Sequence, residues 1–222
     1  MTEHIVGDGD RVILRTSQTG QVQVEFRVEI VSAPPVPPAP PPLPWTPVDV
    51  IASMPTNPQA PNPPATPGRW ATRTAAQIKG ITVHHTGTHD YLAAARYCTG
   101  SKGLPTTQYT YWVQADGTVL HCVPDNLALW HDHAGYPNYY ISVGLAGWVH
   151  QTPPPPAQIA GLAQLCAYLL GKYGIPRARI VGHRDRALPY GVSTQCPGWY
   201  PAPVGSGWKP DFDAALTALL EA

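Results

Sequence analysis

Alternation of apolar and polar positions is strictest near the start of the chain. Residues 11–31 contain the apolar run Val12-Ile13-Leu14, a turn sequence at 17–20, and then apolar residues at every second position: Val22, Val24, Phe26, Val28 and Ile30. A period of two is typical of β-strands, so this segment predicts a β-hairpin. A lone two-stranded hairpin is only marginally stable in water, and its apolar face must therefore pack on another surface.

From residue 76 onward, helix and strand patterns are mixed. Residues 157–173 carry an apolar stripe at helical spacing, with prolines before it and Gly174-Ile175-Pro176 after it. Asp116-Gly117 is a hairpin-turn signal between two strand patterns. The helices we expect are 89–98, 157–173 and 211–221, and the strands are 79–85, 108–114, 118–123, 140–146 and 179–182. This order predicts an α/β fold, with a mixed central β-sheet flanked by helices and a small N-terminal β-hairpin appendage.

Two proline-rich stretches divide the chain. Residues 34–47 read as a polyproline spacer, which would span on the order of 40 Å if fully extended. Residues 55–68 are also rich in proline and lack periodicity, so we expect them to wrap a surface rather than form an element. The predicted organisation is an appendage at 1–33, a linker at 34–47 and the main domain at 48–222.

Composition narrows the classes of function. The chain has 222 residues, of which 43% are hydrophobic and 13% charged, and its net charge is zero. Nucleic-acid binding is not expected, because it needs clustered lysine and arginine. Membrane insertion is not expected either, since no apolar run approaches the length of a transmembrane helix. The first eleven residues have neither a basic nor an apolar region, so they do not predict a secretory signal.

Candidate chemistry comes from three residues far apart in sequence: His84, His183 and Cys196. Imidazole nitrogen and thiolate sulfur are favoured ligands of Zn²⁺, and a catalytic zinc keeps three protein ligands and one open position. The two histidines follow short β-branched runs, and the cysteine lies in a Pro-Gly turn, where side chains of distant segments can converge. Of the other cysteines, Cys166 falls on the apolar helix stripe, and Cys98 with Cys122 would be free thiols or one disulfide.

Six motifs occur in a fixed order between residues 76 and 198. They are ITVHHTG at 81–87, QYTYWVQADGTV at 108–119, Trp130-His131 with Ala134-Gly135, Asn138 with SVGL at 142–145, GHRD at 182–185, and TQCPG at 194–198. In this order they resemble the zinc-dependent N-acetylmuramoyl-L-alanine amidases, the family shared by phage amidase-type lysozymes and peptidoglycan recognition proteins. The resemblance covers residues 48–222 and implies an amidase catalytic domain with a zinc groove at the sheet edge.

The resemblance also implies roles for individual residues. His84, His183 and Cys196 would be the zinc ligands, with Tyr109 and Thr194 as the catalytic pair that assists them. For Tyr109 the alternative is packing within an aromatic stretch of a strand, and for Thr194 it is a turn hydroxyl that caps local backbone. No carboxylate base is evident, and the proton for the leaving amine would come from Tyr109, another histidine or water. Arg184 and Asp185 are expected to brace the loop after His183.

A further segment, Trp130, His131 and Asn138, looks like the substrate-binding part of the cleft. For His131 we weigh a cleft wall equally against structural hydrogen bonding. His85, the next residue after His84, should point to the opposite face of its strand and is not expected to be a ligand.

The function implied is hydrolysis of the amide bond between N-acetylmuramic acid and L-alanine, with bacterial peptidoglycan, a muramyl peptide polymer, as the partner and Zn²⁺ as the cofactor. The alternatives are a non-catalytic peptidoglycan-binding module of the recognition-protein type and a metal-independent structural protein. A wall hydrolase without an export signal suggests a phage endolysin, held in the cytoplasm until it is released to the cell wall, or a virion-associated lysin. The hairpin would then serve in self-association or wall attachment.

Overall fold

The computed structural model describes residues 2–5, 11–14, 45–62, 68–133 and 137–222, and the chain divides into two compact units, Met1–Pro38 and Ala39–Ala222. Its strands are β1 Thr2–Ile5, β2 Arg11–Leu14, β3 Val48–Asp49, β4 Ala71–Thr72, β5 Gly80–His85, β6 Tyr111–Val113, β7 Val119–His121, β8 Leu127–Ala128, β9 Tyr140–Leu145 and β10 Ile180–Gly182. Its α-helices are α1 Tyr91–Thr99, α2 Pro156–Tyr173, α3 His183–Ala187 and α4 Lys209–Leu220. Single 3₁₀ turns lie at Ile51–Ser53, Ala75–Gln77, Arg177–Arg179 and Leu188–Tyr190.

In the first unit, β1 and β2 form an antiparallel pair in which Thr2 lies opposite Leu14. The strand expected at the start of the 11–31 hairpin is therefore present as β2. The expected partner strand at 22–30, and residues 34–44 of the predicted spacer, lie outside the described residues.

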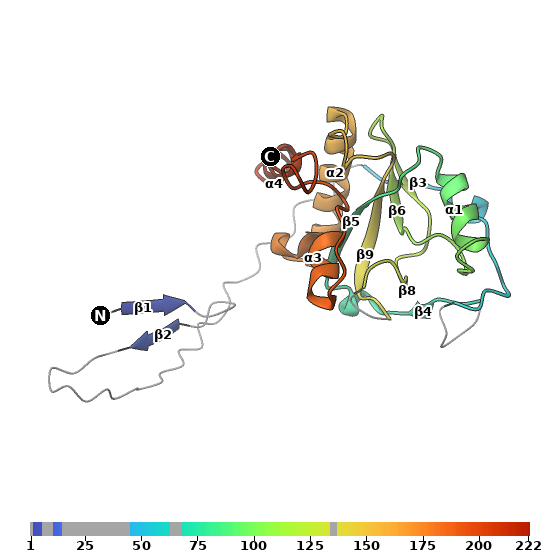
Figure 1. The fold of residues 1–222 in the computed structure, drawn as a ribbon, viewed down its shortest axis with the longest axis horizontal. Helices are drawn as coiled ribbons and strands as arrows, with labels where there is room; N and C mark the ends of the chain where they lie inside the picture. Colours follow the sequence, from blue (N-terminus) through green and yellow to red (C-terminus); the bar gives the residue numbers. More distant parts are fainter. Residues whose placement is uncertain (1, 6–10, 15–44, 63–67, 134–136) are drawn as a thin grey trace. The chain divides into compact units, whose positions relative to one another are not determined.

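In the second unit, six strands form one sheet in the order β10-β5-β9-β6-β7-β3 (Figure 1). The pairs β10–β5, β5–β9, β9–β6 and β7–β3 are parallel, and β6–β7 is an antiparallel hairpin. The hairpin turns at Asp116-Gly117, as predicted, and Gly117 has a φ of +88° that suits glycine. The mixed sheet that the sequence predicted is confirmed.

Helices cover both faces of this sheet, with α2 and α4 on one side and α1 on the other (Figure 1). Side chains at alternate positions of β5, β6 and β9, such as Val83, Val113 and Val143, join the core beneath α2 and α4. The intervening positions face the α1 side, where Trp112 packs with Cys98 and Leu104 in a second core. Because His84 follows Val83, the period of two places it on the α1 face.

The helices and strands expected from residue 76 onward are all present, and their ends fall within three residues of the prediction. Helix α2 begins at Pro156 and ends at Tyr173, and Gly174 caps it in a left-handed conformation. The sequence did not predict α3, the strand β1 or the two-residue strands β3, β4 and β8. No helix in the described part of the chain is long and apolar enough to cross a membrane.

The second proline-rich stretch lies on the surface, as far as it is described. Asn57 N donates to Pro105 O at 2.8 Å, and Asn62 Nδ2 donates to Lys102 O at 3.1 Å. These bonds attach residues 55–62 to the loop after α1. In the first stretch, Trp45 packs edge-on against Tyr168 of α2, with ring centroids 6.0 Å apart.

Candidate metal centre

The first candidate ligand lies near the C-terminal end of β5. His84 is buried, with 3% of its surface exposed. Its neighbour His85 is half-buried and stacks on the ring of His150 at a centroid distance of 4.3 Å. Both histidines line one cavity, but the cluster of possible ligands includes His84 and not His85, as expected.

The second and third candidates are brought together by the segment after β10. Strand β10 runs parallel to β5 at the sheet edge, and His183 is the first residue of the short helix α3 rather than a loop residue. A Cβ atom on Gly182 would lie 2.7 Å from Pro197 Cδ, so this glycine allows the turn that carries Cys196 to pack closely. Arg184 N donates to Cys196 O at 2.8 Å, and the Arg184 guanidinium donates to Thr194 O at 2.8 Å. Arg184 thus braces the loop, as expected.

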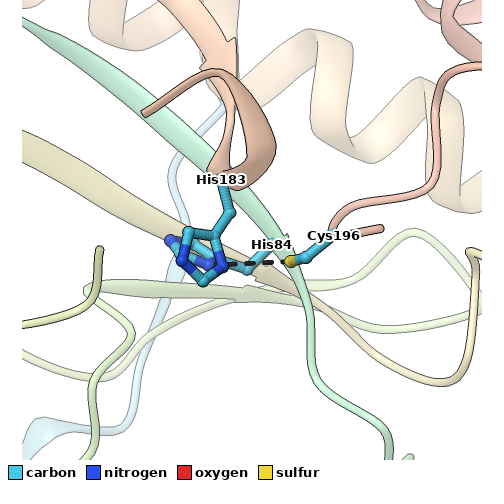
Figure 2. Close-up of side chains that lie close together, drawn as sticks. All are labelled: His84, His183 and Cys196. Atoms are coloured by element: carbon cyan, nitrogen blue, oxygen red, sulfur yellow. Dashed lines mark hydrogen bonds between the residues drawn. The ribbon is translucent and has the colours of Figure 1, made fainter. Parts of the chain in front are cut away.

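The three side chains converge on one point, as Figure 2 shows. Their candidate ligand atoms all lie within 4.8 Å of one another. His84 Nδ1 is 3.8 Å from Cys196 Sγ, close to the separation of about 3.6 Å that ideal zinc bond lengths and a tetrahedral angle would give. His183 Nε2 is buried and has no hydrogen-bond partner among the described residues. A buried nitrogen without a partner, beside a second imidazole and a thiol, fits a zinc ion.

The protonation of these groups is consistent with a cation site. Burial lowers the pKa of His84 well below its usual value, and burial with the nearby His133 lowers the pKa of His183 to about 4. Both imidazoles are therefore neutral at pH 7, as metal ligands must be. Burial raises the pKa of the Cys196 thiol to about 12, although the backbone N–H of His85 donates to its sulfur at 3.2 Å. Loss of the thiol proton here would require a cation beside the sulfur.

The two residues expected to assist catalysis lie at the same place. The ring of Tyr109 meets that of His84 edge-on at a centroid distance of 5.8 Å, and burial raises the pKa of its phenol, which therefore keeps its proton. The Thr194 hydroxyl accepts a hydrogen bond from Cys196 N at 3.2 Å, which is the local capping contact weighed as its alternative role. Both residues line the cavity in front of the three candidate ligands.

This cavity has a volume of about 530 Å³. Trp130, expected at the cleft, lines it and is 40% exposed. Residues to which the sequence gave no role also line it, among them Lys102, Gln108 and His133. His133 stacks on His183 with ring centroids 5.6 Å apart. Gln108 begins one of the six motifs without a role of its own, and no sequence pattern singled out Lys102 or His133, because their segments become neighbours only in the fold. Ala134-Gly135, which belong to the same sequence motif as Trp130-His131, lie outside the described residues.

The remaining expected substrate residues are buried. His131 forms part of the cavity wall, and its Nδ1 lies 3.1 Å from His84 Nε2. Asn138 is 2% exposed and donates to Asp132 Oδ1 at 2.6 Å. A substrate-binding role for Trp130, His131 or Asn138 stays a prediction. All four cysteines are free and buried, so the possible disulfide between Cys98 and Cys122 does not form.

Comparison with known proteins gives one family and one fold. The family model described as N-acetylmuramoyl-L-alanine amidase matches residues 74–199, more than half of the chain. No curated protein gives a significant sequence match.

Among solved structures, the amidase LysC from Clostridium intestinale URNW superposes with a TM-score of 0.52 and 22% identity, covering 67% of this chain and 92% of LysC. The endolysin of Thermus scotoductus MAT2119 bacteriophage Ph2119 gives a TM-score of 0.50 and 21% identity, covering 58% of this chain and 82% of the endolysin. Peptidoglycan recognition protein LE, solved with tracheal cytotoxin, gives 0.51 and 16%, covering 64% of this chain and 89% of that protein. At these identities the likeness shows a shared fold.

Proposed function

The chain belongs to the N-acetylmuramoyl-L-alanine amidase family, and from this premise we propose that it is a zinc-dependent enzyme that hydrolyses the amide bond between N-acetylmuramic acid and L-alanine in peptidoglycan. The observation that carries the proposal is the convergence of His84, His183 and Cys196 at the floor of an open cavity. A bound zinc would be held by one nitrogen of each imidazole and by the cysteine sulfur.

Zinc, when bound, supplies Lewis acidity that polarises a carbonyl group and makes a water molecule more acidic. The other contributions to catalysis would come from the chain's own residues. The protonated phenol of Tyr109, beside His84, would donate a hydrogen bond to the oxygen that becomes negative when the amide is attacked. The Thr194 hydroxyl already accepts from Cys196 N, so its proton is free to point into the cavity. Trp130 would offer an exposed ring to the muramyl peptide at the rim.

A second candidate, a peptidoglycan-binding module without catalysis, is favoured by the fold shared with recognition protein LE. Against it stands the complete ligand set, since a module that only binds needs no thiol among its zinc ligands. We also propose the role of an endolysin, a role that the Ph2119 protein of the same fold carries in its name. That role predicts lysis from within only when the inner membrane is permeabilised.

The experiment that tests the activity is digestion of purified peptidoglycan followed by analysis of the new chemical ends. An amidase releases peptides with a free N-terminal alanine and creates no new reducing sugar ends, and a zinc chelator stops it. New reducing ends would instead indicate a glycosidase. Tight binding to peptidoglycan with no new ends would favour the binding module.

A further inference from the structure

Behind the candidate metal centre, His84 is linked to a second buried histidine. His84 Nε2 lies 3.1 Å from His131 Nδ1, and His131 Nε2 lies 3.1 Å from the carbonyl oxygen of Tyr140. His84 is 3% exposed and His131 7%, so water does not compete readily for these contacts. The other nitrogen of His84, Nδ1, is the one that faces Cys196 Sγ.

The end of this chain of contacts fixes where each proton lies. A carbonyl oxygen only accepts hydrogen bonds, so the nitrogen of His131 that faces Tyr140 O must carry a proton. The neutral imidazole of His131 then has its lone pair on Nδ1, which faces His84. His84 must therefore carry its own proton on Nε2 in order to donate to that lone pair. The lone pair of His84 is left on Nδ1, directed toward Cys196.

The alternative proton arrangements are disfavoured. A proton on His84 Nδ1 would leave two lone pairs facing each other between the imidazoles, in a buried place where each polar atom needs a partner. A second proton on His131 would create a buried cation. The nearest carboxylate does not change this assignment, because Asp132 Oδ2 lies 3.7 Å from His131 Nδ1 and already accepts from Arg186 Nε at 3.1 Å and Thr82 Oγ1 at 3.2 Å.

His131 is itself held in place on both sides. Asn138 Nδ2 donates to the carboxylate of Asp132, the residue next to His131, while Asn138 Oδ1 accepts from the backbone N–H of Tyr140 at 2.9 Å. Arg73 Nη1 also donates to Tyr140 O at 2.8 Å, which fixes the acceptor that orients His131. The ring of His131 thus has a defined position and a defined donor and acceptor.

We propose that His131 is a positioning residue, which keeps the proton of His84 on Nε2 and so presents His84 Nδ1 as the metal-binding nitrogen. The expected effect on zinc affinity rests on the proposed zinc site, whereas the proton assignment holds for the metal-free chain. Hydrogen-bond partners of metal-bound histidines typically contribute about 10- to 100-fold to metal affinity. The same magnitude is expected here.

The test compares full-length wild type with His131→Phe and His131→Gln, using Zn²⁺ and a chromophoric chelator in competition. Phenylalanine keeps the ring volume but cannot accept from His84, and we expect its Zn²⁺ affinity to fall by about 10- to 100-fold. Glutamine can accept from His84 and donate to Tyr140, and its affinity should stay within a few-fold of wild type. Equal affinity of wild type and His131→Phe, or equal weakness of both variants, would overturn the proposal.

A second measurement needs no variant and no metal. In the ¹⁵N spectrum of metal-free wild type near pH 7, His84 and His131 should both be neutral with the proton on Nε2. A proton on Nδ1 of either histidine would overturn the inference even if zinc binds. Wild type that shows the expected protonation but binds no zinc would instead overturn the proposed function and leave the proton assignment standing.

Discussion

Gly144 of β9 lies opposite His84 of β5 in the parallel register, and a Cβ atom on Gly144 would lie 2.9 Å from the ring of Tyr109. The same atom would lie 2.8 Å from Thr86 Cγ2. Tyr109 therefore reaches the edge of the His84 ring across a position where only glycine fits. The pairing of β5 with β9 thus sets the distance between a candidate ligand and a candidate catalytic residue.

The first prediction follows from this crowding. Gly144→Ala should displace Tyr109, lower turnover by about 10-fold or more and destabilise the fold by about 1–3 kcal/mol, while zinc content stays close to wild type. Steady-state kinetics, metal analysis and denaturant unfolding measure the three effects. The matched control is Ser142→Ala on the same strand face, because the buried Ser142 hydroxyl has no hydrogen-bond partner among the described residues. Equal effects of the two substitutions would contradict the argument.

The second prediction concerns the ligand set. Cys196→Ser should lose most of its zinc after dialysis, because a hydroxyl is a far poorer ligand than a thiolate, and His183→Ala should do the same. Metal content per chain is read by atomic absorption. Cys166→Ala, which changes a free thiol on the buried face of α2, serves as the control and should keep its zinc. Full zinc occupancy in Cys196→Ser would show that the ligand set is wrong.

The third prediction isolates the phenol of Tyr109. Tyr109→Phe keeps the ring against His84 but removes the hydrogen-bond donor, so zinc content should be unchanged while kcat falls by roughly 10²-fold. Turnover is measured on a soluble muropeptide. Tyr111→Phe is the comparison, since Tyr111 OH donates to Asp125 instead, on the face of the sheet covered by α2. Unchanged turnover in Tyr109→Phe would contradict the catalytic role of Tyr109 but not the proposed reaction.

The sequence could predict those features of the site that depend on residues close together in the chain, and not those that depend on contacts between distant segments. Period-two alternation gave the strands and placed His84 and His85 on different faces, because strand geometry is local. The helix at His183 was not predicted, since its five residues follow a strand directly and are capped by Gly182 and Asp185. The contact between His84 and His131 could not be predicted from the sequence either. It depends on the loop between β8 and β9 returning to the first strand of the site, and no local pattern encodes that return.

Lys102 and Asn62 illustrate the same limit. Both line the cavity, yet they belong to a turn after α1 and to a proline-rich stretch without periodicity. Their placement comes from hydrogen bonds between two irregular segments, in which the side chain and the backbone N–H of Asn62 donate to the carbonyls of Lys102 and Gly103, and sequence patterns do not reveal these bonds. The strands β4 and β8, two residues each, are likewise too short to carry a pattern.

The fourth prediction concerns acid stability on the opposite side of the sheet from the candidate metal centre. Asp125 Oδ2 accepts from Tyr111 OH at 3.0 Å, from Lys172 Nζ at 2.9 Å and from Tyr173 OH. Burial alone would raise the pKa of Asp125, but the contact with His121 and these three hydrogen bonds outweigh burial and hold the pKa well below its usual range. A carboxyl with a lowered folded-state pKa stabilises the fold above its unfolded pKa of about 3.9 and loses that contribution as the pH falls toward the folded value.

Asp125→Asn should therefore lower the free energy of unfolding by roughly 2–3 kcal/mol at pH 7, and the difference from wild type should shrink as the pH falls below about 4. Lys172 is 37% exposed, so solvent partly screens its ion pair with Asp125. Denaturant unfolding across this pH range measures it. Asp213→Asn removes a similar but exposed pair with Lys209 and should cost less than about 1 kcal/mol. If the difference in unfolding free energy between wild type and Asp125→Asn instead grows toward low pH, the lowered pKa of Asp125 is wrong.

The fifth prediction concerns the N-terminal boundary. The sequence predicted a linker at 34–47, but Trp45 packs on Tyr168 and on the core beneath α2, while the first compact unit ends at Pro38. A chain of residues 39–222 should fold, bind zinc and cleave soluble muropeptides at close to the full-length rate, because it contains all the residues assigned to metal and chemistry. A chain of residues 48–222 lacks Trp45 and should be less stable by about 1 kcal/mol, with the same turnover when folded.

Trp45→Ala in the full-length chain separates the two effects, because it removes the aromatic contact and keeps the first unit. It should match the stability loss of residues 48–222, whereas oligomeric size and activity on intact cells should change only when residues 1–38 are removed. Light scattering and cell-lysis assays read these two properties. We expect the two effects to be separate because Trp45 contributes a ring to the core of the second unit, whereas β1 and β2 pair with each other in the first unit. If residues 39–222 aggregate or lose zinc, the first unit is part of the amidase core, and both the predicted boundary and its independent role are wrong.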